Sequence, residues 1–316
     1  MSALRIVFFG TAELACPSLA ALAQSPEFEV AAVVTQPDRP KGRHLIPQPS
    51  AVKTLAMEKG LPVFQPDRAR SGPFIDQLSA LRPDLILVVA YGQILPRQIL
   101  ELPRFGCVNV HASLLPKYRG AAPIQWAVLN DERETGVTIM KMDEGLDTGD
   151  ILSQQATPIG ADDNAQTLHV RLAKTGADLL LATVRDYVAG RITRRKQPEE
   201  GASYARKITR DDGRLDWSLS ARSLWNRVRA LVPWPGAWTC LAAEPKPQLL
   251  KIWRAELADG SSSSPGEILA VGQEGIQVAC GEGALRLLVV QLEGGRKLKV
   301  GEFLAGHRLE RGRRLS

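Results

Sequence analysis

The sequence lacks the cysteine and histidine clusters that hold most structural metal ions. Its four cysteines, Cys16, Cys107, Cys240 and Cys280, are far apart, and none belongs to a C-x-x-C pair. We expect four buried free thiols in a reducing compartment, and no metal. Cys107 has a second interpretation as a nucleophile because it lies two residues before Asn109, but the sequence shows no base that would activate it.

Long apolar runs are also missing. A membrane helix needs ~18 consecutive apolar residues, and no segment approaches that length. The first ten residues have neither a basic start nor a cleavage site, so they predict a first β-strand rather than a secretion signal. We therefore expect a cytoplasmic protein without a membrane partner. The 316 residues, of which 44% are hydrophobic, suffice for about two domains, each with its own core.

A dinucleotide-binding motif is absent from the place where it would be expected. The segment Gly10-Thr-Ala-Glu-Leu-Ala15 follows the first apolar run. A nicotinamide-dependent dehydrogenase would need three glycines there, in the pattern G-x-G-x-x-G. Only one glycine is present, so the sequence argues against that class of enzyme.

The net charge of +6 is distributed unevenly along the chain. Residues 1–203 contain equal numbers of basic and acidic side chains, whereas residues 204–316 contain 18 Lys/Arg and 12 Asp/Glu. A basic region attached to a neutral one favours a polyanionic partner, such as a nucleic acid, on the basic side. The alternative is a solvated surface that is merely basic, and charge alone leaves both open.

Strand and helix signals alternate through the first part of the chain. This order predicts an α/β fold with a doubly wound, mostly parallel sheet and helices on both faces. A ligand site is then expected at the carboxyl ends of the strands. Strands are expected at 4–9, 28–35, 61–65, 84–91 and 106–111, and helices at 11–24, 50–60, 73–81 and 164–189.

The last part of the chain has a different composition and contains five of the six tryptophans. We interpret these chiefly as core residues, with base stacking as the alternative. Several short strands predict a small β-barrel, for which the five-stranded oligonucleotide-binding (OB) barrel fits the length. We divide the chain into residues 1–189, a polar linker 190–203 and residues 204–316. A helix is expected at 220–231 and strands at 236–241, 249–255, 266–271, 275–279 and 284–291.

A proline-rich segment, Gln36 to Pro49, interrupts the first part. It contains four prolines and several basic residues, among them Arg39, Lys41 and Arg43. Because proline lacks a backbone N–H group, the composition predicts a loop without regular structure. Such a loop at the end of a strand is either functional or disordered.

Polar residues suited to chemistry follow the strand at 106–111. Asn109 and His111 are two residues apart, so their side chains share one face at the carboxyl end of that strand. Asp147 lies in a glycine-containing acidic loop. If it folds beside His111, the trio suits attack of an amine on a carbonyl carbon, with Asn109 stabilising the oxyanion and His111 relaying a proton. The alternative is an ordinary strand end with satisfied polar side chains.

These residues occur in a recognisable order. Asn109-x-His111, the turn Ser113-Leu-Leu-Pro116, the segment Arg119 to Ile124 and the loop around Asp147 together resemble the signature of folate-dependent formyltransferases. The resemblance extends over essentially the whole chain and is strongest to members that act on methionyl-tRNA. It implies a Rossmann-like formyl-transfer domain followed by an OB-like domain that binds tRNA.

The resemblance also implies roles for individual residues. The donor would be 10-formyltetrahydrofolate, the acceptor would be the α-amino group of initiator methionyl-tRNA, and no metal would take part. We expect the backbone N–H groups of the Ser113–Pro116 turn to be free. The implied catalytic residues are Asn109, His111 and Asp147, the implied folate-binding residues are Ser113, Leu114, Leu115 and Pro116, and the implied tRNA-binding residues are Arg39, Lys41 and Arg43.

Two other functions remain open on the sequence. A formyltransferase with the same first domain could act on a small amine, but that acceptor would not need the basic last third of the chain. A non-catalytic RNA-binding protein would keep the barrel and leave the Asn109/His111 face idle. Substitution of His111 separates an enzyme from a protein that only binds RNA, because RNA binding alone would not depend on His111. A monomer is expected in each case.

Overall fold

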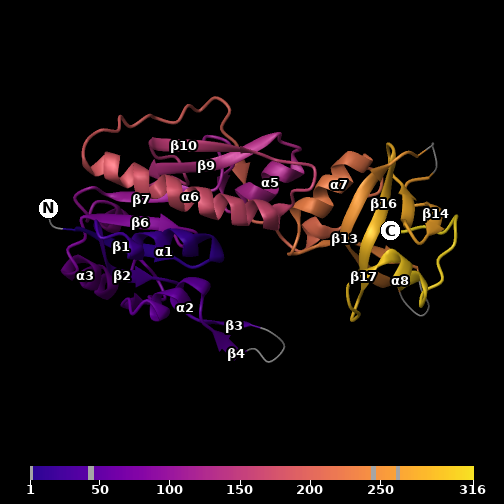
Figure 1. Cartoon of the computed structure of the whole chain (residues 1–316), viewed down its shortest axis with the longest axis horizontal. Helices are drawn as coiled ribbons and strands as arrows, with labels where there is room; N and C mark the ends of the chain where they lie inside the picture. Colours follow the sequence, from indigo (N-terminus) through magenta and orange to yellow (C-terminus); the bar gives the residue numbers. More distant parts are fainter. Residues whose placement is uncertain (1–2, 42–45, 243–246, 261–263) are drawn as a thin grey trace. The chain divides into compact units, whose positions relative to one another are not determined.

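The computed structural model describes residues 3–41, 46–242, 247–260 and 264–316, and it confirms the expected fold class. Segments that are distant in the sequence join to form two units (Figure 1). The first unit comprises Met1–Pro123, Glu134–Pro158 and His169–Ala205, and the second comprises Ile124–Arg133, Ile159–Leu168 and Arg206–Ser316.

A seven-stranded sheet forms the centre of the first unit, in the order β10-β9-β7-β6-β1-β2-β5. Five strands run parallel, and their side chains are largely apolar because both faces of the sheet are covered. Two antiparallel strands that the sequence did not indicate, β9 and β10, extend the sheet beyond β7. The bounds are β1 Leu4–Gly10, β2 Phe28–Val34, β5 Val63–Phe64, β6 Leu85–Val89, β7 Cys107–His111, β9 Glu134–Lys141 and β10 Ile151–Pro158.

Helices cover both faces of this sheet. Cys107 of β7 belongs to the same apolar cluster as Phe74 of α3. Val110, which points to the opposite face of β7, lies beside Gly176 of α6. The doubly wound arrangement is therefore confirmed. The helices of this unit are α1 Cys16–Gln24, α2 Ala51–Glu58, α3 Gly72–Ala80, α4 Arg97–Leu100 and most of α6 Ala165–Val188, whereas nearly all of α5 Pro123–Leu129 belongs to the second unit.

The start of the first helix was predicted wrongly. A short 3-10 turn at Glu13–Ala15 precedes α1, so the α-helix begins at Cys16 rather than after Thr11. The Thr11 hydroxyl instead donates a hydrogen bond to the carbonyl oxygen of Tyr91, at 2.9 Å. This bond ties the end of β1 to the end of β6. Ser50, by contrast, caps α2 as expected by accepting a hydrogen bond from the backbone N–H of Lys53.

The proline-rich segment contains regular structure, contrary to the prediction. Strand β3 (Arg39–Lys41) pairs antiparallel with β4 (Ile46–Gln48), and Pro40 lies opposite Pro47 (Figure 1). A ribbon of only two strands tolerates proline because each strand has an edge that needs no N–H donor. Arg43 lies outside the described residues.

The second unit contains an antiparallel sheet in the order β12-β13-β16-β15-β14, with β17 paired to β16. Leu315 bridges to Leu241 at the end of β12, and Arg314 bridges to Glu267 just before β14. The last residues therefore join the two edges of the sheet, which makes it the small barrel that was expected. The bounds are β12 Ala237–Leu241, β13 Gln248–Ala258, β14 Ile268–Gly272, β15 Gly275–Ala279, β16 Ala284–Leu292, β17 Leu298–Lys299, α7 Ala221–Ala230 and α8 Val300–Leu304.

The barrel core includes two of the tryptophans. Trp217 and Trp225 are buried against apolar side chains of the barrel, whereas Trp234 is 56% exposed. The indole N–H of Trp217 donates to the hydroxyl of Thr239, at 3.0 Å. The interpretation as core residues therefore holds for two of them. Within the described ranges, none of the helices combines the length and the hydrophobicity needed to cross a membrane.

Closure of the barrel by the last residues can be tested at Leu315, whose side chain is 4% exposed in the core. Leu315→Ala should lower the free energy of unfolding of this unit by about 2–3 kcal/mol, because it leaves a cavity in the core. Urea denaturation monitored by tryptophan fluorescence measures the change. Leu219→Ala, at a leucine that is 38% exposed, is the matched control and should lower the free energy of unfolding by clearly less. Equal costs for the two variants would contradict the closure.

Candidate active site

The carboxyl end of β7 places two polar side chains against a cavity. Asn109 and His111 are 9% and 5% exposed, share one face of the strand, and line a cavity of about 540 Å³ in the first unit. Apolar strands surround them, since β7 lies between β6 and β9. Their polarity at buried positions indicates a site rather than an ordinary strand end.

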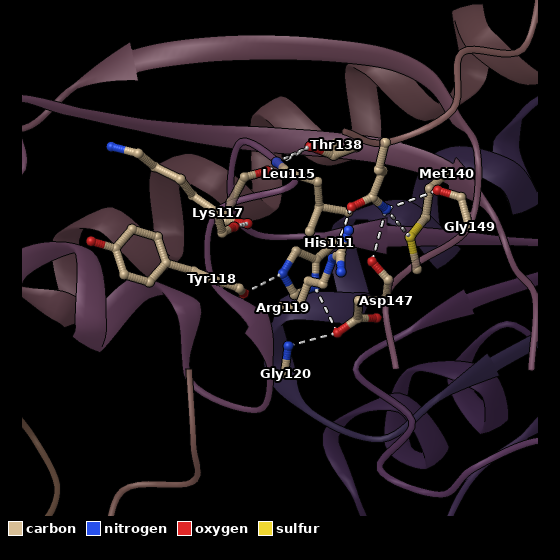
Figure 2. A network of polar contacts seen from close by, with 12 residues as sticks. His111, Leu115, Lys117, Tyr118, Arg119, Gly120, Thr138, Met140, Asp147 and Gly149 are labelled. Carbon is tan, nitrogen blue, oxygen red and sulfur yellow. Dashed lines mark hydrogen bonds and ion pairs between the residues drawn. The ribbon is translucent and has the colours of Figure 1, made fainter. Parts of the chain in front are cut away.

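The imidazole of His111 is held between a carbonyl oxygen and a carboxylate. Its Nε2 atom lies 2.9 Å from the backbone oxygen of Tyr118, and its Nδ1 atom lies 3.6 Å from Oδ2 of Asp147 (Figure 2). A carbonyl oxygen can only accept, so Nε2 must carry the proton. Nδ1 is then the ring nitrogen that faces the carboxylate of Asp147. The structure thus brings Asp147 beside His111, as the functional interpretation required.

The carboxylate of Asp147 is fixed by the backbone. The N–H group of Gly120 donates to Oδ2 at 2.8 Å. Asp147 itself has a φ of 55°, in the left-handed region, which costs a non-glycine residue about 1–2 kcal/mol. Gly149 lets the loop lie against β9, because a Cβ atom there would come within 1.8 Å of the carbonyl oxygen of Lys141. The loop is therefore a strained turn held in place by its neighbours.

The Ser113–Pro116 turn is bound to the sheet rather than open to a ligand. The backbone N–H of Leu115 donates to Oγ1 of Thr138 at 3.1 Å, and the Thr138 hydroxyl donates to the carbonyl oxygen of Ser113 at 2.7 Å. The amide of Gln154 donates to the carbonyl oxygen of Leu115 at 2.8 Å. The expectation of free N–H groups is therefore wrong for Leu115, because β9 supplies an acceptor. None of the four residues of the turn is part of the cavity wall.

The loop after β6 forms much of the cavity wall, and the sequence analysis missed it. Its residues 90–95 line the cavity together with the loop 142–147. Ile94 and Leu146, at 82% and 55% exposure, present apolar side chains there. Burial raises the pKa of Tyr91 to about 12, so its phenol stays neutral at working pH. The available signal was the position of this loop directly after the most apolar strand of the chain.

Arg39, one of the expected tRNA-binding residues, is not part of the cavity wall. Arg39 is exposed, and its guanidinium contacts the side-chain oxygen of Gln36. Lys41 belongs to β3, and Arg43 falls outside the described residues. Among the residues that the structure describes, no group of three or more His, Cys, Asp or Glu side chains is arranged to hold a metal ion.

The thiol of Cys107 is unsuited to nucleophilic attack. It is 1% exposed, donates to the carbonyl oxygen of Ile99, and has its pKa raised to about 12 by burial. Cys280 is also buried, whereas Cys16 and Cys240 are partly exposed. The expectation of free thiols is thus correct for all four, and the expectation of burial for two.

Comparison with known proteins gives matches along nearly the whole chain. Residues 4–184 match the family model described as formyl transferase, and residues 207–308 match formyl transferase, C-terminal domain. The methionyl-tRNA formyltransferase of Geobacter sulfurreducens is 50% identical over 317 residues, covering 100% of this chain and 98% of that protein. That of Citrifermentans bemidjiense is 49% identical over 312 residues, covering 99% and 96%.

A solved structure shares the fold at lower identity. HypX from Aquifex aeolicus in complex with tetrahydrofolic acid superposes with a TM-score of 0.65 at 18% sequence identity. The match covers 98% of this chain and 51% of that one. Both units of the present structure therefore have counterparts in proteins of known structure.

Burial of Cys107 predicts that it resists alkylation. With a pKa of about 12, only about one thiol in 10⁴ is ionised at pH 8, and the thiolate is the reactive form. Treatment of the folded protein with iodoacetamide should leave Cys107 unmodified by peptide mass spectrometry, while the partly exposed Cys240 is labelled. Unfolding in urea should make both react. Rapid labelling of Cys107 in the folded protein would restore its interpretation as a nucleophile.

Proposed function

This chain belongs to the methionyl-tRNA formyltransferase family, and on that premise we propose that it transfers the formyl group of 10-formyltetrahydrofolate to the α-amino group of initiator methionyl-tRNA. The observation that carries the proposal is the position of His111. Its Nδ1 atom faces the carboxylate of Asp147 at the wall of a cavity that Asn109 also lines. A base, a charge partner and an amide donor therefore meet at one place.

Each of these three groups has a role in the transfer. The acceptor amine attacks the formyl carbon, a C–N bond forms, and the carbonyl electron pair moves to oxygen. The Asn109 amide donates a hydrogen bond to that oxygen, as a donor in an oxyanion hole does. Nδ1 of His111 accepts the amine proton, and Asp147 stabilises the resulting imidazolium. The intermediate then collapses, the bond to N10 of the folate breaks, and the imidazolium returns a proton to N10.

The folate fits the cavity by size and by chemistry. A volume of about 540 Å³ lies within the range of ~300–1,000 Å³ that is usual for small-molecule sites. Leu95, Met142 and Leu146 supply apolar surface for an aromatic ring system. Contact between folate and the Ser113–Pro116 turn remains a prediction, and the partly exposed side chains of Leu114 and Pro116 are the ones able to make it.

Binding of tRNA is assigned to two parts of the chain. We assign it to the barrel domain, residues 204–316, because that domain contributes all of the net positive charge. Arg39 and Lys41 of β3, together with Arg43, are assigned to the same partner. Residues 1–189 then carry out the chemistry and 190–203 connect the domains, in a monomer located in the cytoplasm.

Substitution of the catalytic trio tests the proposed reaction. With 10-formyltetrahydrofolate and methionyl-tRNA as substrates, His111→Ala should lower the rate of formyl transfer by ~10²–10⁴-fold, because the proton acceptor is lost. Asn109→Ala should lower it by ~10²–10³-fold through loss of an oxyanion donor. Asp147→Asn keeps an acceptor for the N–H of Gly120 but removes the charge, so it should also slow transfer.

A matched control accompanies these variants. Asp178→Asn changes an exposed carboxylate on α6 that pairs with Lys174 at the surface, and this variant should transfer formyl groups at the wild-type rate. Wild-type protein that leaves methionyl-tRNA unmodified would overturn the proposed function. Full activity of His111→Ala would overturn the role of the imidazole.

Neutralising the β3–β4 ribbon tests its assignment to tRNA. A variant with Arg39, Lys41 and Arg43 all changed to Gln should raise the KM for tRNA without changing the KM for folate. Each lost phosphate contact should reduce the slope of log affinity against log salt by ~0.7–0.9. A second triple variant, with exposed Lys59, Arg68 and Arg70 changed to Gln, controls for net charge. Identical salt slopes for the two variants would remove the ribbon from the interface.

A further inference from the structure

The side chain of Gln197 reaches the catalytic loop from a segment that the sequence analysis treated as a linker. Its amide nitrogen donates to the carbonyl oxygen of Asp147 at 2.8 Å and to that of Gly149 at 2.8 Å. One carboxamide thus holds both sides of the turn that carries the catalytic carboxylate. Asp147, Gly149 and Arg119 all belong to the polar network drawn in Figure 2.

Arg119 determines which way the carboxamide of Gln197 points. Its Nε–H donates to Oε1 of Gln197 at 3.1 Å. A guanidinium can only donate, so the atom that faces it must be the amide oxygen. The two N–H groups of Gln197 are then directed to the two carbonyl oxygens, which can only accept. The orientation of this amide therefore follows from the chemistry of its three partners.

Arg119 is a buried cation with few partners among the described residues. Its side chain is 1% exposed, and its Nη2 atom has no hydrogen-bond partner among the described residues. Its ion pair with Glu199, at 3.6 Å, involves a carboxylate that is 86% exposed. Burying a cation with so little compensation is costly. A function in orienting Gln197 explains why a charged residue occupies this position.

Arg119 and Gly120 form one short strand, and both support Asp147. Strand β8, Arg119–Gly120, pairs with β11, Tyr204–Ala205. Gly120 binds the carboxylate of Asp147 through its N–H group, while Arg119 acts on the backbone of Asp147 through Gln197. The left-handed φ of Asp147 makes such support necessary, because an unsupported turn would relax to another conformation.

We propose that Gln197, oriented by Arg119, is a positioning residue that keeps the carboxylate of Asp147 against His111. The expected effect on catalysis rests on the proposed function. The brace itself, which is the set of hydrogen bonds from Arg119 to Gln197 and from Gln197 to the backbone of Asp147 and Gly149, is an observed geometry. Neither Gln197 nor Arg119 lines the cavity, so neither contacts the folate there. Loss of the brace therefore slows the chemical step and leaves substrate binding nearly unchanged.

Replacement of Gln197 tests the brace in solution. Gln197→Leu keeps the approximate volume but removes the donor and the acceptor. Its kcat should fall by ~10–100-fold, the loss expected when a catalytic group is displaced by about 1 Å. The KM values for 10-formyltetrahydrofolate and methionyl-tRNA should stay close to those of the wild type. Gln155→Leu, at an exposed glutamine of β10, is the matched control and should behave as the wild type.

A double-mutant cycle separates positioning from a general loss of structure. If Gln197 acts through Asp147, the variant carrying both Asp147→Asn and Gln197→Leu should be no slower than Asp147→Asn alone. Multiplicative losses would mean that Gln197 acts elsewhere and would overturn the proposal. If the Leu variant does not fold, Gln197→Glu provides the same test, because it keeps an oxygen for Arg119 and removes both N–H donors.

A crystal structure of Gln197→Leu tests the geometry independently of activity. The distance between Nδ1 of His111 and Oδ2 of Asp147, 3.6 Å in the wild type, should increase, and the turn at 147–149 should shift. An unchanged turn would overturn the brace whatever the kinetics show. A wild-type protein unable to formylate methionyl-tRNA, together with a shifted turn in the variant, would overturn the proposed function and leave the brace intact.

Discussion

The apposition of His111 and Asp147 is the constraint on which the rest of the site depends. His111 ends β7, and Asp147 lies in the loop that follows β9. Because β9 is antiparallel to β7, with Thr138 opposite His111 and Lys141 opposite Val108, β9 runs away from the imidazole. The loop must therefore fold back to return a carboxylate to it. That return requires the left-handed backbone at Asp147, the absence of a side chain at Gly149 and the hydrogen bonds from Gly120 and Gln197.

The same geometry explains the orientation of the His111 imidazole. The carbonyl oxygen of Tyr118 accepts a hydrogen bond from Nε2–H of His111, so Nδ1 is the ring nitrogen that faces the carboxylate of Asp147. Tyr118 is placed by the turn that Ser113 begins, and Thr138 and Gln154 bind that turn to the sheet. The two antiparallel strands at the sheet edge therefore support both sides of His111. A motif that looks like a ligand-binding turn in the sequence serves here as part of that support.

The two units differ in how they are packed. The first unit buries apolar side chains on both faces of its sheet, and its buried polar side chains Asn109 and His111 lie at a strand end beside the cavity. The second closes a barrel with its own last residues, packs Trp217 and Trp225 inside, and includes the basic residues of 206–316. The proposed transfer between such different substrates needs both a site for the small donor and a basic surface for the polyanionic acceptor.

The sequence by itself determined the parallel strands, most helices and the barrel strands, because apolar runs, a cap such as Ser50 and periodic patterns are local signals. It also singled out Asn109, His111 and Asp147, since two residues share a strand face and the third lies in a glycine-containing loop. Only the tertiary structure decided three contacts. Asp147 lies beside His111, Thr138 accepts a hydrogen bond from the backbone N–H of Leu115, and Gln197 donates a hydrogen bond to the backbone of Asp147. These contacts join residues that are 23 to 50 positions apart in the sequence. A local sequence pattern cannot predict them, because they form only when the chain folds and brings such residues together.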